Sequence, residues 1–216
     1  MNRLPAVVVI LFSVIANGCI GPSVGGSGHV ISETRNMSGF SNVSLEGSGR
    51  LVIEQSGVES LTVTGDDNLL NYVETGVRGN TLVLGEKSGV SLSPSKDILF
   101  KVTLRKLDAL EISGSGVAEA KGIQSAKLKV ELSGSGEVSA EGAADDLDIA
   151  ISGSGRFRGE GLKSKRTTVD ISGSGSAVIA SNETLNATVS GSGSIEYVGN
   201  PRVHQDISGS GSIRKR

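Results

Sequence analysis

The chain has 216 residues, a formal net charge of −2, one cysteine, two histidines and no tryptophan. A single cysteine excludes a disulfide framework and a multi-cysteine metal site, and two histidines far apart in the sequence argue against a histidine zinc site or a Ser-His-Asp triad. The near-neutral charge gives no general attraction to nucleic acid, so we expect no nucleic-acid partner. We also expect no metal and no other cofactor.

The first 18 residues have the pattern of a secretory signal peptide. Arg3 supplies a positive charge, Leu4 to Ile15 form an apolar run that is short for a bilayer span, and small residues precede Cys19. This order resembles a bacterial lipobox, in which the cysteine is diacylated and becomes the new N-terminus. Two acyl chains anchor a protein stably. An ordinary signal peptide with an incidental cysteine and an uncleaved anchor are the alternatives.

The residues after Cys19 indicate the membrane in which the protein is anchored and the linker to the domain. Ile20 stands where an aspartate would favour the inner membrane, so we expect an outer-membrane lipoprotein. Residues 19–34 contain Gly25-Gly26-Ser27-Gly28 and predict a flexible tether. The remaining residues, 35–216, are expected to form one β-helical domain.

The N-terminal part of this domain is irregular. Short apolar segments at 43–45, 51–53, 61–64 and 81–84 are separated by turn signals, among them Gly65-Asp66-Asp67-Asn68. They predict coils or hairpins of atypical sequence, as expected for the terminal repeats that cap a solenoid.

A four-residue motif repeats through the rest of the chain. Ser-Gly-Ser-Gly recurs every 18–20 residues, starting at 113, 133, 152, 172, 190 and 208, and Glu46-Gly47-Ser48-Gly49 is an earlier relative. The flanks alternate apolar and polar residues, which indicates β-strands. One such unit cannot bury its apolar face alone, but stacked units can. The sequence therefore predicts an all-β, single-stranded parallel β-helix with coils of 18–20 residues. An antiparallel sandwich is the rival, but it gives no reason for one motif per coil.

The alternation also assigns faces. It predicts that both glycines of each motif point inward and both serines outward. It predicts one internal ladder of aliphatic side chains: Ile112, Leu132, Ile151, Ile171, Val189 and Ile207. The basic C-terminus, Arg214-Lys215-Arg216, is expected to discourage end-to-end stacking at the open end of the solenoid.

These motifs resemble a known family. The repeated apolar-x-Ile-Ser-Gly-Ser-Gly, the entry Phe40 to Gly49 and the exit Tyr197 to Ile213 are similar to those of the family called putative auto-transporter adhesin, head GIN domain. The resemblance covers roughly residues 38–216. It implies a right-handed β-helical fold, a secreted or lipid-anchored bacterial protein and an adhesin-like role, and it supplies no catalytic residues.

The outward serines are the largest regular feature and the candidate binding face. Two parallel columns of hydroxyls could bind extended glycans through many weak hydrogen bonds. Alternatively, serine is only a small polar neighbour of a glycine bend. Ice binding is disfavoured because the columns contain no threonine. The candidate residues are Ser113, Ser115, Ser133, Ser135, Ser152, Ser154, Ser172, Ser174, Ser190, Ser192, Ser208 and Ser210.

Carboxylates offer weaker alternatives. Stacked Glu111 and Glu131 could share Ca²⁺, and Asp145-Asp146-x-Asp148 faintly resembles a calcium loop, but solvated side chains explain both better. The pairs Glu119 with Glu137 and Glu141 with Glu160 could serve a polysaccharide-cleaving enzyme. Few aromatic residues and no long loops argue against a sugar-processing cleft.

We therefore expect a non-catalytic extracytoplasmic lipoprotein, attached to the membrane through Cys19, that acts as an adhesin-like surface module. Its expected partners are a polysaccharide or a cell-surface protein. A structural envelope protein without a specific ligand and, behind it, a carbohydrate-active enzyme are the alternatives.

Overall fold

The computed structural model describes residues 23–216, which form strands and one short 3-10 helix. The head contains β1 (Ser23–Gly25), β2 (Val30–Arg35), β3 (Asn42–Gly47), β4 (Arg50–Gln55), β5 (Ser60–Asp66), the 3-10 helix η1 (Leu70–Tyr72), β6 (Val73–Arg78), β7 (Thr81–Glu86), β8 (Ser91–Ser93) and β9 (Leu99–Leu104). The solenoid contains β10 (Ala109–Gly114), β11 (Val117–Gly134), β12 (Glu137–Gly153), β13 (Arg156–Gly173), β14 (Ser176–Gly191), β15 (Ser194–Val198), β16 (Arg202–Gly209) and β17 (Ser212–Lys215). Within these residues, no helix is long and apolar enough to cross a membrane.

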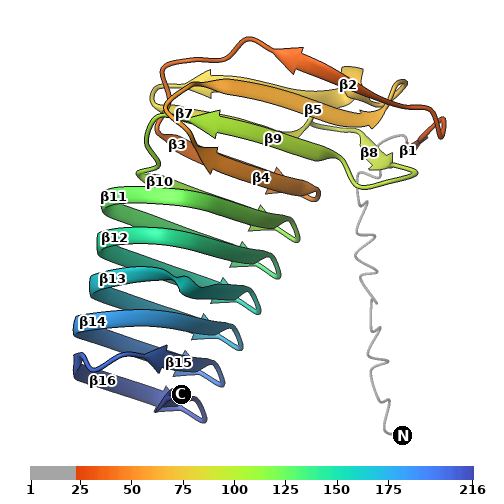
Figure 1. Ribbon diagram of the computed structural model, residues 1–216. Helices are drawn as coiled ribbons and strands as arrows, with labels where there is room; N and C mark the ends of the chain where they lie inside the picture. The colour runs from red at the N-terminus through yellow and green to blue at the C-terminus, as the bar shows by residue number, and fades with distance from the viewer. Residues whose placement is uncertain (1–22) are drawn as a thin grey trace, which may run out of the picture.

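The solenoid is a stack of parallel coils, as the repeat predicted (Figure 1). Strand pairing places equivalent residues of successive coils side by side, and the predicted aliphatic ladder is confirmed from Ile112 to Ile207. Its first five members are at most 2% exposed, whereas Ile207 in the last coil is 40% exposed. Burial of the ladder therefore depends on a neighbouring coil on each side.

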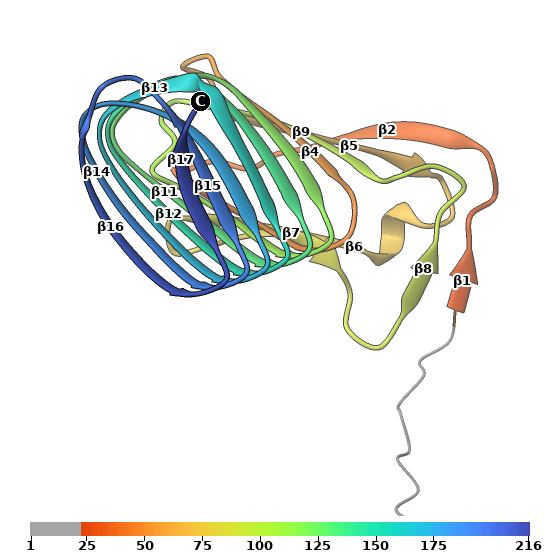
Figure 2. The same ribbon diagram turned by 90° about the horizontal axis from the view of Figure 1, so that it is seen from below.

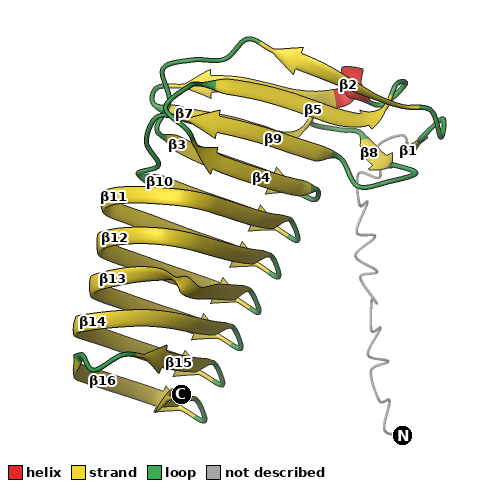
Figure 3. Ribbon diagram, in the orientation of Figure 1, coloured by secondary structure: helices red, strands yellow, loops and turns green. Residues whose placement is uncertain are grey.

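Each coil has two walls, which are joined at one edge by a tight turn and at the other by a bend within one continuous strand (Figures 1 and 3). We call these the turn edge and the bend edge. The turns are the Ser-Gly-Ser-Gly motifs, and the bends lie near residues 121–127 of β11 and at equivalent positions of β12 to β14. Figure 2, a view along the stack, shows the coils nested over one another.

The head extends both walls with hairpin strands. On one wall β4 lies on β11, β9 pairs with β4, and β5 and β2 follow in antiparallel order. On the other wall β3 lies on β10, and β7 and β6 complete the sheet, with β6 antiparallel. The turn at residues 46–49 sits directly above the first full motif, because the Ser115 amide donates to the Gly47 carbonyl at 3.0 Å. The irregular N-terminal segments thus cap the stack.

Two parts of the segment expected to be a flexible tether, residues 19–34, are in strands, namely Ser23–Gly25 and the beginning of β2 from Val30. β1 pairs with β8, and β2 pairs with β5. The Gly28 amide also donates to a carboxylate oxygen of Asp66 at 2.8 Å. The predicted signal peptide and the predicted lipid-attachment residue Cys19 lie outside the described residues.

Candidate functional site

The turn edge is built from backbone hydrogen bonds. The Ser135 amide donates to the Gly114 carbonyl at 2.9 Å, and the Glu137 amide donates to the Gly116 carbonyl at 3.0 Å. The same two bonds recur in the later coils, at 2.8–3.0 Å. The turns therefore stack in register without help from serine side chains.

The first glycine of each motif does not point inward as predicted. It was predicted to point inward, but Gly134 and Gly153 are exposed residues of the turn. Gly153 has a φ of +109°, which L side chains rarely adopt, and a Cβ there would lie 2.6 Å from the Gly134 carbonyl oxygen. This glycine is required by turn conformation and close backbone approach, and the strict period of two ends at the turn.

The second glycine fulfils its prediction. Gly136, Gly155 and Gly175 are buried beneath the aliphatic ladder. A Cβ on Gly136 would lie 2.7 Å from a methyl carbon of Ile112 in the preceding coil. Inward glycine thus makes room for the large ladder residue above it.

The serines of the motif line the turn edge, and we call the twelve together the serine ribbon. Strand register places Ser113 beside Ser133, and the first serines of the remaining coils continue this column. Eleven of the twelve are exposed and Ser113 is half-buried. Successive coils are about 4.8 Å apart, so the hydroxyls repeat at that spacing. The predicted serines are therefore brought together on one edge.

Three other serines, on the bend edge, have the opposite arrangement, which sequence reasoning missed. Ser125, Ser164 and Ser181 are buried, and their hydroxyls donate to the carbonyls of Lys127, Ala180 and Thr184 at 2.8–3.0 Å. Within residues 23–216, the hydroxyls of the serine ribbon have no such protein partner. The only sequence signal was that these positions are polar in an inward column.

The ribbon ends at the head in an open cleft of about 480 Å³. Glu46 and Glu86 line this cleft together with Ser48 and Ser115. Glu46 occupies the register position of Ser113, and the Ser48 hydroxyl donates to Glu86 at 3.2 Å. The cleft places two carboxylates at the end of the hydroxyl columns.

Four of the five carboxylates considered as calcium ligands pair with cations. Glu111 and Glu131 are register neighbours as predicted, but Lys129 lies 2.9 Å from Glu131. Asp145 and Asp148 pair with lysines of neighbouring coils at 2.8 and 2.9 Å. Residues 23–216 contain no group of three or more metal-ligating side chains arranged to hold an ion.

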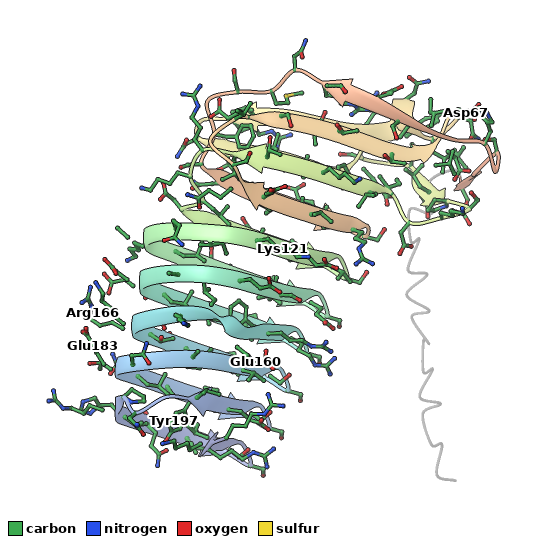
Figure 4. The ribbon with its side chains drawn as sticks, in the orientation of Figure 1. Asp67, Lys121, Glu160, Arg166, Glu183 and Tyr197 are labelled. Atoms are coloured by element: carbon green, nitrogen blue, oxygen red, sulfur yellow. The ribbon has the colours of Figure 1, made fainter. Side chains whose placement is uncertain are left out.

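The bend edge carries ion pairs between coils. The Arg166 guanidinium lies 2.5 Å from Asp146 and 3.9 Å from Glu183 (Figure 4). The hydrogen bond from Arg166 is the main cause that lowers the pKa of Asp146. The basic segment at 163–166 is therefore partly neutralised by the coils on either side.

Three of the four carboxylates considered for an enzyme are also paired with cations. Glu119 contacts Arg50, and Glu137 lies 3.2 Å from Arg158. Glu160 lies 2.9 Å from Arg216. The geometry gives no support to paired-carboxylate chemistry at these positions.

A buried carboxylate holds the head together. Asp66 is fully buried and accepts hydrogen bonds from the Ser95 hydroxyl at 2.6 Å and from the Ser95 and Gly28 amides at 2.8 Å. These bonds, led by the Ser95 hydroxyl, lower its pKa. The sequence indicated only a turn at this point, so the hydrogen bonds through which Asp66 holds the N-terminal segment were not predicted.

The fold and the ribbon define a parallel β-solenoid with a capped head and one repetitive polar edge. A family model described as putative auto-transporter adhesin, head GIN domain, matches residues 39–201. The chain therefore belongs to that adhesin-like family, as the repeat motifs indicated, and this membership indicates a cell-surface or envelope location. No curated protein matches the chain.

Solved structures of bacterial proteins share the fold. A putative adhesin from Bacteroides fragilis is 22% identical with a TM-score of 0.75, covering 89% of this chain and 100% of that one. A putative lipid binding protein from Parabacteroides distasonis is 26% identical with a TM-score of 0.60, covering 90% and 99%. A putative adhesin from Parabacteroides merdae is 22% identical with a TM-score of 0.56, covering 90% and 99%.

Proposed function

We propose that this protein is a non-catalytic, lipid-anchored adhesin-like module of the outer membrane whose serine ribbon binds an extended polysaccharide. The observation that carries the proposal is the register of the ribbon: exposed hydroxyl pairs recur coil after coil on a backbone that does not need them. Membership of an adhesin-like family supports the binding role.

The chemistry of the ribbon suits a polymer with many hydroxyls. Each serine hydroxyl both donates and accepts a hydrogen bond. One such bond contributes only about 1 kcal/mol net, so a short ligand would be held weakly. A long ligand that contacts several coils at once would gain affinity through the rigid spacing of the ribbon.

The cleft at the head would fix the end of such a ligand. Glu46 and Glu86 are acceptors that sugar hydroxyls can satisfy, and they lie where the ribbon stops. The anchor at Cys19 is consistent with this arrangement, because β1 in the head is the first element after it. The head would then face the membrane and the stack of coils would extend away from it.

The test is a glycan and envelope-polysaccharide array, probed with the purified mature chain with and without Ca²⁺. We expect reproducible binding to one class of polymer. The double variant Ser135→Arg and Ser154→Arg should reduce that binding at least tenfold, because two bulky charged side chains block adjacent turns. Thermal unfolding of the variant should match that of the parent, since both serines are exposed.

The matched control is Ala126→Arg with Asn182→Arg. Both positions are exposed and lie at the bend edge, so the control adds the same charge away from the ribbon. It should leave binding unchanged. Equal loss in both double variants would place the ligand elsewhere. A blank array would favour the structural envelope protein, and degradation of an arrayed polymer would favour the enzyme.

A further inference from the structure

The two ends of the solenoid are finished differently. At the far end from the head, β16 pairs only with β14 and β17 only with β15, and the described residues provide no strand for their outer edges. An unpaired strand edge presents free backbone N–H and C=O groups and is a template for another chain.

The same end exposes apolar core. Ile207 is 40% exposed, whereas Val189 directly above it is fully buried. Val203 and Ile213 are half-buried, whereas their register neighbours Leu185 and Ile195 are fully buried. The last coil therefore has the composition of an interior coil, but no further coil among residues 23–216 covers it.

The basic C-terminus does not shield this end as expected. Arg214 contacts Glu196, and Arg216 lies 2.9 Å from Glu160. Lys215 donates to the side-chain carbonyl of Asn200. These cations are folded back against preceding coils, so their charge is partly compensated and does not repel an approaching partner in full.

We propose that the open end binds the open end of a second copy of this chain, with two-fold symmetry. A two-fold axis makes β16 antiparallel to β16 of the second copy, and its own sequence is complementary in that arrangement. With Gln205 on the axis, Val203 lies opposite Ile207 of the second copy and both face the core. His204 and Asp206 then lie opposite each other on the outer face.

Gln205 fixes this register. It stands in an inward column that is otherwise apolar, below Ala187. Two glutamine amides that meet on the axis can donate to and accept from one another, as paired polar residues do at coiled-coil interfaces. A shift by one residue would move every core side chain of β16 to the outside.

A two-fold contact uses the same surface on both copies, so it occupies both open ends at once and leaves neither free to add a further copy. The contact at the open end therefore closes as a dimer, with the two heads at opposite ends of a doubled stack.

The first experiment measures self-association by sedimentation velocity of the mature chain carrying Cys19→Ser, which keeps it free of lipid. We expect a monomer–dimer equilibrium that saturates at the dimer. Ile207→Lys should weaken it at least tenfold, because it puts a charge into the buried interface. Val58→Lys is the matched control on the head, since Val58 is 66% exposed, and it should leave the dimer intact.

The second experiment does not depend on the stability of Ile207→Lys. In the same cysteine-free background, Gln205→Cys should form an intermolecular disulfide under mild oxidation, because directly opposed residues of antiparallel strands have Cα atoms about 5 Å apart. Ser135→Cys, on the serine ribbon away from the open end, should not. A protein that is monomeric at all concentrations, an open-ended polymer, or equal cross-linking of both cysteines would overturn the proposal.

Discussion

The two edges of the solenoid hold successive coils together with different parts of the chain. At the turn edge, successive coils are joined by backbone hydrogen bonds, and the motif is the same in every coil. At the bend edge, the sequence varies, hydroxyls of buried serines bind carbonyls, and ion pairs such as Asp146 with Arg166 cross between coils. Because backbone hydrogen bonds hold the turn edge together, its serine side chains remain free. The turn edge is therefore the better candidate for binding.

The largest expected effect breaks the turn edge. Gly153→Val should lower the free energy of unfolding by about 3 kcal/mol or more, because valine is strained at positive φ and its Cβ meets a backbone oxygen of the coil above. The adjacent Ser154→Val should change it by no more than about 0.5 kcal/mol, since Ser154 is exposed. Urea unfolding measures both. Equal effects would mean that the turn is not held by its glycines.

A smaller effect is expected at the bend edge. Ser164→Ala removes a buried hydroxyl that bonds the Ala180 carbonyl at 2.9 Å and the Thr167 hydroxyl at 2.5 Å. The partners left behind are unsatisfied, so the free energy of unfolding should fall by about 1–2 kcal/mol. Ser154→Ala on the ribbon is the control and should be nearly silent. Urea unfolding of the two alanine variants compares the edges directly, and a silent Ser164→Ala would remove the distinction drawn between them.

Much of the solenoid could be predicted because its repeat carries the same information many times. The spacing of the motif determined the length of the coil, and the apolar alternation placed the ladder from Ile112 to Ile207 correctly. The first glycine was misassigned because alternation assumes a straight strand, whereas the backbone at Gly153 turns with positive φ. A period of two contains no signal for where a strand stops being extended.

The head and the bend edge could not be predicted for another reason. Asp66 binds Gly28 and Ser95, which lie 38 and 29 residues away, and nothing repeats that would reveal such pairs. Ser164 and Ser181 occupy the same column as Ala144, so the column has no constant residue type. Where each contact occurs once, only the three-dimensional arrangement identifies the partners. The serine ribbon was found because it repeats, whereas the cleft at Glu46 and Glu86 was missed because it does not.

The smallest expected effect concerns the ion pairs of the bend edge. Arg166→Gln removes the cation beside Asp146, and because both groups are solvent-accessible, the loss should be smaller than that of Ser164→Ala and should shrink further in high salt. Lys163→Gln is the control, since it removes a neighbouring positive charge that makes no ion pair within residues 23–216.

Lowering the pH tests the Asp146–Arg166 ion pair separately from the turn edge, because the Ser-Gly-Ser-Gly motif has no titratable side chain. The pKa of Asp146 in the folded protein lies below its usual value of 3.8, so its pairing stabilises the fold above that pH and the stabilisation is lost as the pH falls through the folded pKa. The urea midpoints of the parent and Arg166→Gln should therefore differ at neutral pH, and the difference should shrink as the pH falls from neutral to below 3.8. A constant difference across that range would mean that Arg166 acts through packing of its aliphatic stem, and the bend edge would then resemble the turn edge in being insensitive to charge.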